Sequence, residues 1–253
     1  RDTDGIYKNS TTLIGVSEDQ SIVSTAVRSA NNAASADDTL TIRGNNTQYL
    51  VDVRTGDSIK TIVDKVNAAK DQTGVSASGK TVATLLNLVD DGTVGFKLNG
   101  KNTDMPVTIS ANVKTDDLSE LVTAINKEAE TTGITAELSA DKRSIRLVNE
   151  EGYDIKITQF THTGATKSLD VMGATGGQQS LVQAANTDLM TIGGSISFDS
   201  EGMFSVESLL GGDEGGVLTG TSAPSTAYSD RVSVADINVN TREAATKAIK
   251  VLD

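Results

Sequence analysis

Two stretches of the chain decide its fold because they share one pattern: DSIKTIVDKVNAAKDQTGVSAS at residues 57–78 and DDLSELVTAINKEAETTGITAEL at residues 116–138. One constant shift, which carries residue 59 onto residue 118, aligns them without a gap. The matched pairs are Ile59 with Leu118, Ile62 with Leu121, Val63 with Val122, Val66 with Ile125, Asn67 with Asn126 and Gly74 with Gly133. A match of this kind indicates an internal repeat.

Each copy has the periodicity of an amphipathic helix. Its apolar residues recur at i, i+3, i+4 and i+7, which places them on one helical face. An aspartate before each apolar stripe, Asp57 or Asp116, is expected to cap the helix, and a glycine after it, Gly74 or Gly133, to end it. The residues expected to pack the cores of the repeats are Ile59, Ile62, Val63 and Val66 in the first copy and Leu118, Leu121, Val122 and Ile125 in the second.

Strand-like segments surround both helices. Residues 40–43 and 49–53 alternate apolar and polar side chains around the turn-prone sequence GNNT, which predicts a β-hairpin. Residues 94–98 and 107–109 give the same signal before the second helix. An amphipathic helix needs a sheet to cover its apolar stripe. The expected fold class is therefore α+β, with two β-rich subdomains in which short amphipathic helices pack on antiparallel sheets.

The order of these segments predicts a nested domain organisation. We expect an outer domain at 37–159 that holds both repeats, at 57–78 and 116–157. The flanks, 1–36 plus 160–231, are expected to form a discontinuous inner domain. Residues 232–253 predict a short strand and the start of a helix whose small residues suit close packing in a bundle. Because the sequence starts without Met and ends within this helix, we expect a longer parent protein.

Composition argues against several classes of partner and cofactor. The net charge of −12 repels phosphate backbones, so we expect no nucleic-acid partner. No stretch approaches the roughly 18 apolar residues of a membrane span, so we expect no membrane insertion. The absence of Cys excludes thiolate sites, and the absence of Trp, with only four Tyr and four Phe, argues against an aromatic-walled ligand pocket. We expect no cofactor.

Residues with catalytic or metal-binding chemistry are few and lack the required spacing. His162 is the sole histidine, and no neighbouring motif supplies a nucleophile, so we expect it in a solvated loop. The acidic pairs Asp90-Asp91, Asp116-Asp117 and Asp213-Glu214 lack the spacing of a calcium loop, and the glycine-rich run at 211–216 lacks the Lys-Ser/Thr of a phosphate loop. We therefore expect no catalytic, cofactor-binding or metal site, and no enzymatic activity.

Two patterns resemble the flagellin family. The first is a helix followed by Asn-x6-Gly-[Val/Ile]-[Ser/Thr]-Ala and a strand-forming run such as RSIRLVNEEGYDIKI. It is similar to a motif of flagellin outer domains, hook-associated proteins and the filament cap. The second, VADINVNTREAATKAIKVLD at 234–253, resembles the segment where flagellin chains re-enter their helical core. The residues that match this core-helix entry are Thr241, Ala245, Ala248, Ile249, Leu252 and Asp253.

The resemblance implies a structural subunit of the bacterial flagellar filament, with variable domains exposed on the surface. It implies a secreted, extracellular protein of the flagellum that self-assembles and serves motility. The implied partners are other flagellin subunits, bound through terminal helices outside this sequence, together with the flagellar export chaperone, the cap and a host receptor. Glycosylation of the Ser/Thr-rich surface is also implied.

Two other functions stay open. A hook–filament junction protein or a filament cap protein shares the first motif, and copy number in isolated filaments distinguishes these minor components from flagellin. A flagellin-like cell-surface protein that binds a glycan or a receptor is the second. The scarcity of aromatic side chains weakens it, because sugar rings usually stack on Trp or Tyr.

Overall fold

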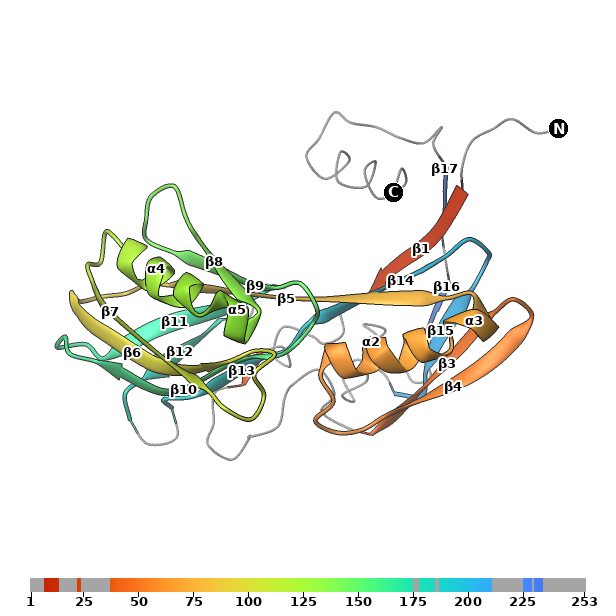
Figure 1. Cartoon of the computed structure of the whole chain (residues 1–253), viewed down its shortest axis with the longest axis horizontal. Coiled ribbons are helices and arrows are strands. Elements are labelled where there is room, and N and C mark those ends of the chain that lie inside the picture. The colour runs from red at the N-terminus through yellow and green to blue at the C-terminus, as the bar shows by residue number, and fades with distance from the viewer. Residues whose placement is uncertain are drawn as a thin grey trace.

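The computed structural model describes residues 7–13, 22–23, 37–174, 178–184, 187–210, 225–228 and 230–233. Within these ranges the chain forms three antiparallel sheets and four short helices. Figure 1 shows an elongated molecule with two lobes, which the long strand β5 (Ser76–Leu86) joins. This β-rich arrangement with few helices is consistent with the expected α+β class.

The first lobe, here called the α2 lobe, is built on a four-stranded sheet of order β16-β15-β3-β4. Its strands are β3 (Asp38–Gly44), β4 (Thr47–Val53), β15 (Ser205–Ser208) and β16 (Ser225–Tyr228). Both turn residues of the β3–β4 hairpin, Asn45 and Asn46, have positive φ, as the preferred two-residue hairpin turn requires. Helices α2 (Ile59–Ala68) and α3 (Lys70–Thr73) follow this hairpin.

The second lobe, here called the α4 lobe, contains a five-stranded sheet of order β2-β13-β10-β6-β7. Its strands are β2 (Ile22–Val23), β6 (Gly92–Asn99), β7 (Val107–Val113), β10 (Ile155–His162) and β13 (Met190–Ile192). Helices α4 (Ser119–Lys127) and α5 (Ala129–Thr132) follow β7. A hairpin therefore precedes a helix in each lobe.

An eight-stranded sheet runs through both lobes. Its main path is β12-β11-β5-β14-β1-β17, with β9 paired to β5 and β8 paired to β9. The other strands are β1 (Tyr7–Leu13), β8 (Ile134–Leu138), β9 (Ile145–Asn149), β11 (Ser168–Gly173), β12 (Gln178–Val182), β14 (Ser195–Ser200) and β17 (Asp230–Ser233). The first half of β5 pairs with β14, and its second half pairs with β9 and β11. One strand thus connects the two lobes.

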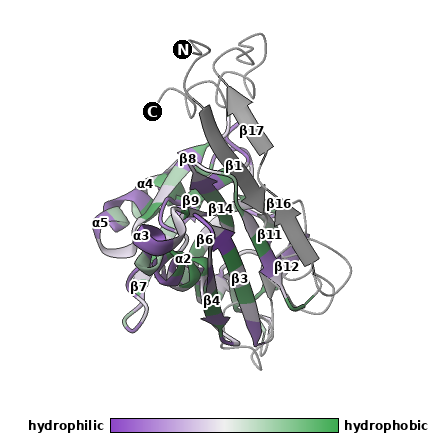
Figure 2. Ribbon diagram, turned by 90° about the vertical axis from the view of Figure 1, so that its right-hand side faces the viewer, coloured by the Kyte–Doolittle hydropathy of each residue, from purple (hydrophilic) through white to green (hydrophobic). Residues whose placement is uncertain are grey.

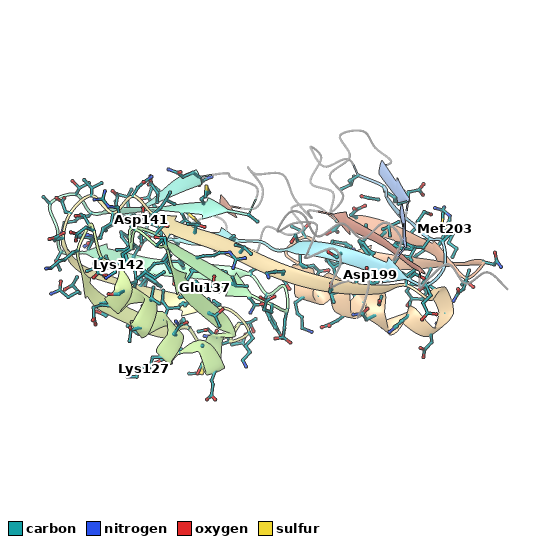
Figure 3. All side chains as sticks on the ribbon, turned by 90° about the horizontal axis from the view of Figure 1, so that it is seen from above. Lys127, Glu137, Asp141, Lys142, Asp199 and Met203 are labelled. Atoms are coloured by element: carbon teal, nitrogen blue, oxygen red, sulfur yellow. The ribbon has the colours of Figure 1, made fainter. Side chains whose placement is uncertain are left out.

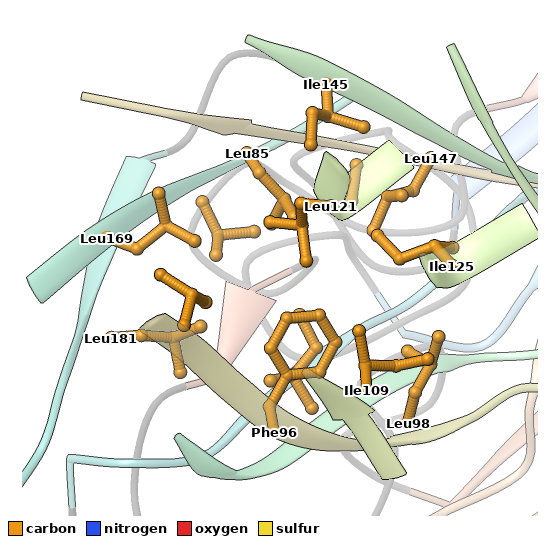
Figure 4. Close-up of a cluster of buried hydrophobic side chains, with 14 of the residues drawn as sticks. Leu85, Phe96, Leu98, Ile109, Leu121, Ile125, Ile145, Leu147, Leu169 and Leu181 are labelled. Atoms are coloured by element: carbon orange, nitrogen blue, oxygen red, sulfur yellow. The ribbon is translucent and has the colours of Figure 1, made fainter. Parts of the chain in front are cut away.

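Two separate clusters of buried apolar side chains form the cores. The α2 lobe holds Leu40, Ile42, Ile59, Ile62, Val66, Phe198 and Val206 among others. The α4 lobe holds the larger cluster, part of which Figure 4 shows, with Leu85, Phe96, Leu121, Ile125 and Leu147 among its members. Apolar and polar residues alternate along strands such as β3 (Figure 2), and Leu40 and Ile42 of this strand are buried. The chain passes from the cluster of the α2 lobe to that of the α4 lobe within β5, between Ala77 and Ala83. It returns to the cluster of the α2 lobe between Ile192 and Ile196.

Some expectations concern residues outside the described part of the chain. Residues 234–253, with Thr241, Ala245, Ala248, Ile249 and Leu252, lie there, as do Asp213 and Glu214. The division into 37–159 and 1–36 plus 160–231 stays a prediction. Among the described helices, none is long and apolar enough to cross a membrane.

Candidate functional site: two helix–strand junctions

The apolar stripes of α2 and α4 face the two cores. Ile59, Ile62, Val63 and Val66 are buried in the α2 lobe, where α2 packs on β5 and β4. Leu118, Leu121 and Ile125 are buried in the α4 lobe, and Val122 is partly buried against the same cluster. Helix α4 packs on β7 and β8. Each stripe therefore covers strands that neighbour its helix along the chain.

The two helices begin later than the aspartates predicted to cap them. The side chain of Ser58 is the N-cap of α2 and accepts a hydrogen bond from Thr61 N. Asp57 instead accepts from Arg54 N at 3.0 Å and pairs with Lys65 at 2.6 Å. The prediction that Asp57 caps the helix was wrong by one position, because these two partners hold its carboxylate on the preceding turn.

The start of α4 differs from the start of α2. Its N-cap position is Leu118, which makes no side-chain capping bond. The carboxylate before it belongs to Asp117, which accepts a hydrogen bond from Ser119 N at 2.9 Å. Hydrogen bonds from Ser119 are the main reason that the pKa of Asp117 lies below its usual value. The prediction that Asp116 caps this helix was therefore also wrong, because Asp116 lies two residues before the N-cap position.

Both helical segments end at a glycine in the left-handed region. Gly74 has φ 69° and Gly133 has φ 67°, and each is the C-cap residue of a short helix, α3 or α5. The N–H of Gly74 donates to Lys70 O at 2.7 Å, and the N–H of Gly133 donates to Ala129 O at 2.8 Å. Glycine suits these positions because a Cβ disfavours positive φ.

A buried threonine before each glycine links the helix end to the next strand. Thr73 Oγ1 donates to Ala69 O at 3.0 Å and accepts from Val75 N at 3.1 Å. Thr132 Oγ1 donates to Glu128 O and accepts from Ile134 N, both at 3.1 Å. Each hydroxyl thus links a helix carbonyl, which also accepts backbone hydrogen bonds, to the first backbone amide after the glycine.

An asparagine on each helix binds the same strand farther along. Asn67 Nδ2 donates to Ala77 O at 2.9 Å, and Asn67 Oδ1 accepts from Ala77 N at 2.7 Å. Asn126 makes the same two bonds with Ala136, at 2.9 and 2.8 Å. The carboxamide therefore pairs with the strand backbone as a neighbouring strand would, and this explains the spacing between the asparagine and the strand.

Sequence reasoning missed both threonines, and it also missed the two glycines that let the hairpins approach these junctions. A Cβ on Gly44 would lie 2.3 Å from Thr73 O, and a Cβ on Gly100 would lie 2.1 Å from Thr132 O. Alignment at the same constant shift pairs Thr73 with Thr132, so an available signal existed for the threonines. The shift that aligns the two threonines does not align Gly44 with Gly100, so the sequence comparison did not pair these glycines.

The expectation of a solvated loop at His162 was wrong, because the residue ends β10 and is 1% exposed. Its Nε2 lies 3.1 Å from Asp90 O, and its Nδ1 accepts from Gly164 N at 2.6 Å. The ring therefore holds two loops together. The carboxylate of Asp90 also accepts a hydrogen bond from Thr166 N, and this bond is the main reason that the pKa of Asp90 lies below its usual value. Within the described ranges, no three His, Asp or Glu side chains form a group that could hold a metal ion.

These features define a β-rich protein in which each lobe fastens a helix to the following strand with the same set of side-chain bonds. The bonds fix backbone geometry and align no group for chemistry. Residues 39–86 and 93–150, which contain the two junctions, both match the family model of the flagellin hook IN motif. The resemblance to flagellins is confirmed in these segments, and the chain is flagellin-like there.

Solved structures with some similarity come from flagellar cap proteins. The flagellar cap protein FliD from Helicobacter pylori shares 9% identity at a TM-score of 0.23, over 61% of this chain and 54% of that one. The D1-D2-D3 domains of FliD from Escherichia coli share 11% identity at a TM-score of 0.20, over 51% and 55%. The chain thus spans about half the length of these two structures. At these TM-scores the likeness assigns no role, and no curated protein matches the sequence.

Proposed function

We propose that the chain is the surface-exposed variable region of a structural subunit of the bacterial flagellar filament. One observation carries the proposal: both segments that match the flagellin hook IN motif are fastened by equivalent bonds, from Asn67 and Asn126 and from Thr73 and Thr132. We interpret them as two copies of one flagellin-type repeat. The protein then acts by assembly outside the cell and has no catalytic activity.

The topology supports a region that projects from a shaft. Strands β1 and β17 are antiparallel neighbours, with Tyr7 opposite Ser233 and Ser10 opposite Asp230. The chain therefore enters and leaves the described body side by side, as an insertion into another structure must. Figure 1 shows the α4 lobe at the end of the long axis away from β17. In this proposal residues 234–253 lead toward the shaft, where the parent chain binds other subunits.

The surface of the α4 lobe supports contact with solvent. Lys127, Glu137 and Lys142, which Figure 3 labels on the α4 lobe, are all exposed. The ion pairs there, such as Arg146 with Glu137 at 3.4 Å, lie on the exposed surface. Exposed pairs of this kind contribute little stability and keep a surface hydrated.

An epitope insertion distinguishes a filament subunit from a cap or junction protein. Met105 lies between β6 and β7 and is 79% exposed, so a short tag after it should leave the core intact. Immunogold labelling of the tagged full-length protein in the source bacterium is expected along the whole filament. Labelling confined to the filament tip would assign a cap instead, and labelling confined to the base would assign a junction protein. Untagged cells are the control for background.

A deletion tests whether the region is dispensable for assembly. Because Ser10 and Asp230 are cross-strand partners, a short Gly/Ser turn can replace residues 11–229 in the full-length protein. We expect filaments that still form and look smoother in electron micrographs. Loss of all filaments, with the shortened protein still secreted, would contradict the proposal that this region decorates the shaft.

Limited proteolysis tests the division of the chain. A stable fragment near 37–159 would support the outer domain predicted from the sequence. A stable fragment between about residues 80 and 193 would instead place the boundary where the apolar clusters change, within β5 and before Ile196.

A further inference from the structure

A polar cavity lies where the two lobes meet, with a volume of about 280 Å³. The α2 lobe contributes Ser58 and Thr61, from the start of α2. The α4 lobe contributes Asn99, Asp154, Lys156 and Thr191. A single water needs only about 10–15 Å³ of such a cavity, so this one has room for several waters or for one small molecule.

The strand register explains why this wall is polar. Lys156 on β10 stands opposite Asn99 on β6 and opposite Thr191 on β13. Ile155 and Ile157, the neighbours of Lys156 along β10, are buried in the core of the α4 lobe. Because side chains alternate between the two faces of a sheet, Lys156 and its row of cross-strand partners face away from that core. They face the start of α2 instead.

Two oxygen atoms in this wall have unmet hydrogen-bonding capacity. Asp154 Oδ1 and Thr191 Oγ1 are buried, and neither has a hydrogen-bond partner within the part of the chain that the structure describes. Thr191 is only 1% exposed. Native proteins rarely leave such atoms without partners, because a buried polar atom without a hydrogen bond has lost its bonds to water and gained none in return. Burial raises the pKa of Asp154 well above its usual value, and the charge of Lys156 opposes that rise.

We propose that the cavity binds a neutral polyhydroxylated ligand about the size of a monosaccharide. Hydroxyl groups donate and accept, so one can donate to Asp154 Oδ1 while another exchanges a hydrogen bond with Thr191 Oγ1. A neutral ligand adds no charge beside the buried Asp154 carboxyl, where burying a charge is costly. Sites of this kind commonly lie at domain interfaces.

Charged ligands fit the same wall less well. An anion would meet the Asp154 carboxylate, and the start of α2 already receives the Ser58 hydroxyl as its cap. A metal cation would meet Lys156, and across the described ranges no group of three acidic or histidine side chains could complete its ligand set. A bound polyol would contact both lobes, close to where Lys60 N donates to Gly152 O at 2.9 Å.

The test uses the purified 253-residue chain with glucose, galactose and N-acetylglucosamine as neutral probes. Glucuronate, glucosamine and calcium chloride are the charged comparisons. Saturation-transfer NMR detects binding, and titration calorimetry measures the affinity. Thr191→Val keeps the side-chain shape and removes the oxygen that has no partner, and Asp154→Asn removes the charge. Thr135→Val, at an exposed position of β8, is the matched control.

We expect at least one neutral sugar to bind and Thr191→Val to weaken that binding roughly tenfold, as loss of a buried hydrogen bond does. The same variant should raise the melting temperature of the unliganded protein, because an oxygen without a partner disappears. Thr135→Val should leave the affinity unchanged. These opposite effects on binding and stability would not arise from a purely structural threonine.

Three results would overturn the proposal: no neutral sugar binds, only a charged probe binds, or binding survives both Thr191→Val and Asp154→Asn unchanged. Asp154→Asn keeps the test decisive if Thr191→Val does not fold. The assay needs no filament, so its outcome is independent of the proposed function.

Discussion

Replacing Asn126 with alanine tests whether the junction between helix and strand, rather than the helix alone, stabilises each motif segment. The Asn126 carboxamide donates to Ala136 O at 2.9 Å and accepts from Ala136 N at 2.8 Å. Alanine is the better helix former, so the helix itself gains from the change. Any loss of stability must therefore come from the two bonds to the strand.

The expected loss follows from burial around Ala136. Two hydrogen bonds at about 1 kcal/mol each give about 2 kcal/mol, and the better helix propensity of alanine returns about 0.5 kcal/mol. Ala136 is 6% exposed, so water replaces the lost partners poorly, and backbone groups left without partners add about 1 kcal/mol. We expect Asn126→Ala to lower the free energy of unfolding by about 2–3 kcal/mol. Asn67→Ala should cost only about 1 kcal/mol, because water reaches the partly buried Ala77 more easily.

Urea unfolding of the purified chain measures both losses, and hydrogen exchange at the amides of Ala77 and Ala136 shows where they act. Asn112→Ala, at an exposed position of β7, is the matched control and should stay within about 0.5 kcal/mol of wild type. If Asn126→Ala changed stability no more than this control, the strand-pairing role of the carboxamide would be refuted. A larger loss for Asn67→Ala than for Asn126→Ala would refute the argument from burial.

Three further changes have defined outcomes. Gly133→Ala should cost about 1–2 kcal/mol in urea unfolding, because φ is 67° and the new Cβ would lie 3.0 Å from Asn149 Nδ2; no loss would contradict the left-handed cap. Gly152→Ala should cost about 1–3 kcal/mol, because φ is 82° and the Cβ would lie 2.9 Å from Ile59 Cγ2; an unchanged calorimetric melting temperature would contradict this close approach. Burial raises the pKa of Asp154, so the folded state binds its proton more tightly and loses stability as pH rises from 3.8 through that raised pKa. Asp154→Asn should therefore raise the melting temperature at pH 7 and match wild type below pH 3.8, and a lower melting temperature at pH 7 would contradict this sign.

The elements that depend on local pattern were predictable from the sequence. The apolar stripe from Ile59 to Val66 indicated the face of α2, and alternation on both sides of Asn45-Asn46 indicated the β3–β4 hairpin. Helix starts were less certain because Asp57 and Ser58 are both good caps. The choice between them depends on Lys65, which binds the Asp57 carboxylate from the last turn of the same helix. Propensity at one position does not contain that information.

The length of β5 was not predictable in the same way. Residues 75–78, VSAS, form only a short β-prone run, and Gly79 would normally weaken a strand interior. The strand continues to Leu86 because the absence of a side chain at Gly79 makes room for Ile59 Cγ2, which would lie 2.7 Å from a Cβ there. That contact joins α2 to the connecting strand. Gly79, which local propensity would treat as a strand breaker, therefore lies where β5 passes from the core of the α2 lobe to the core of the α4 lobe.

The polar cavity shows most clearly why local pattern is insufficient. Alternation along β10 correctly places Ile155 and Ile157 on one face of the strand and Lys156 on the other. From the sequence alone, however, a polar face is expected to contact solvent, unless another element is known to cover it. Thr191 reaches that face through strand pairing, and Ser58 reaches it because α2 packs against the loop at Gly152. Both approaches depend on contacts between segments far apart in the chain. The same limit explains His162, whose ring meets Asp90 from 72 residues earlier. The polar residues of β10 and β13 at this cavity read as surface in the sequence, but the start of α2 in the α2 lobe covers them. Only the three-dimensional register identifies which of their oxygens then lack partners.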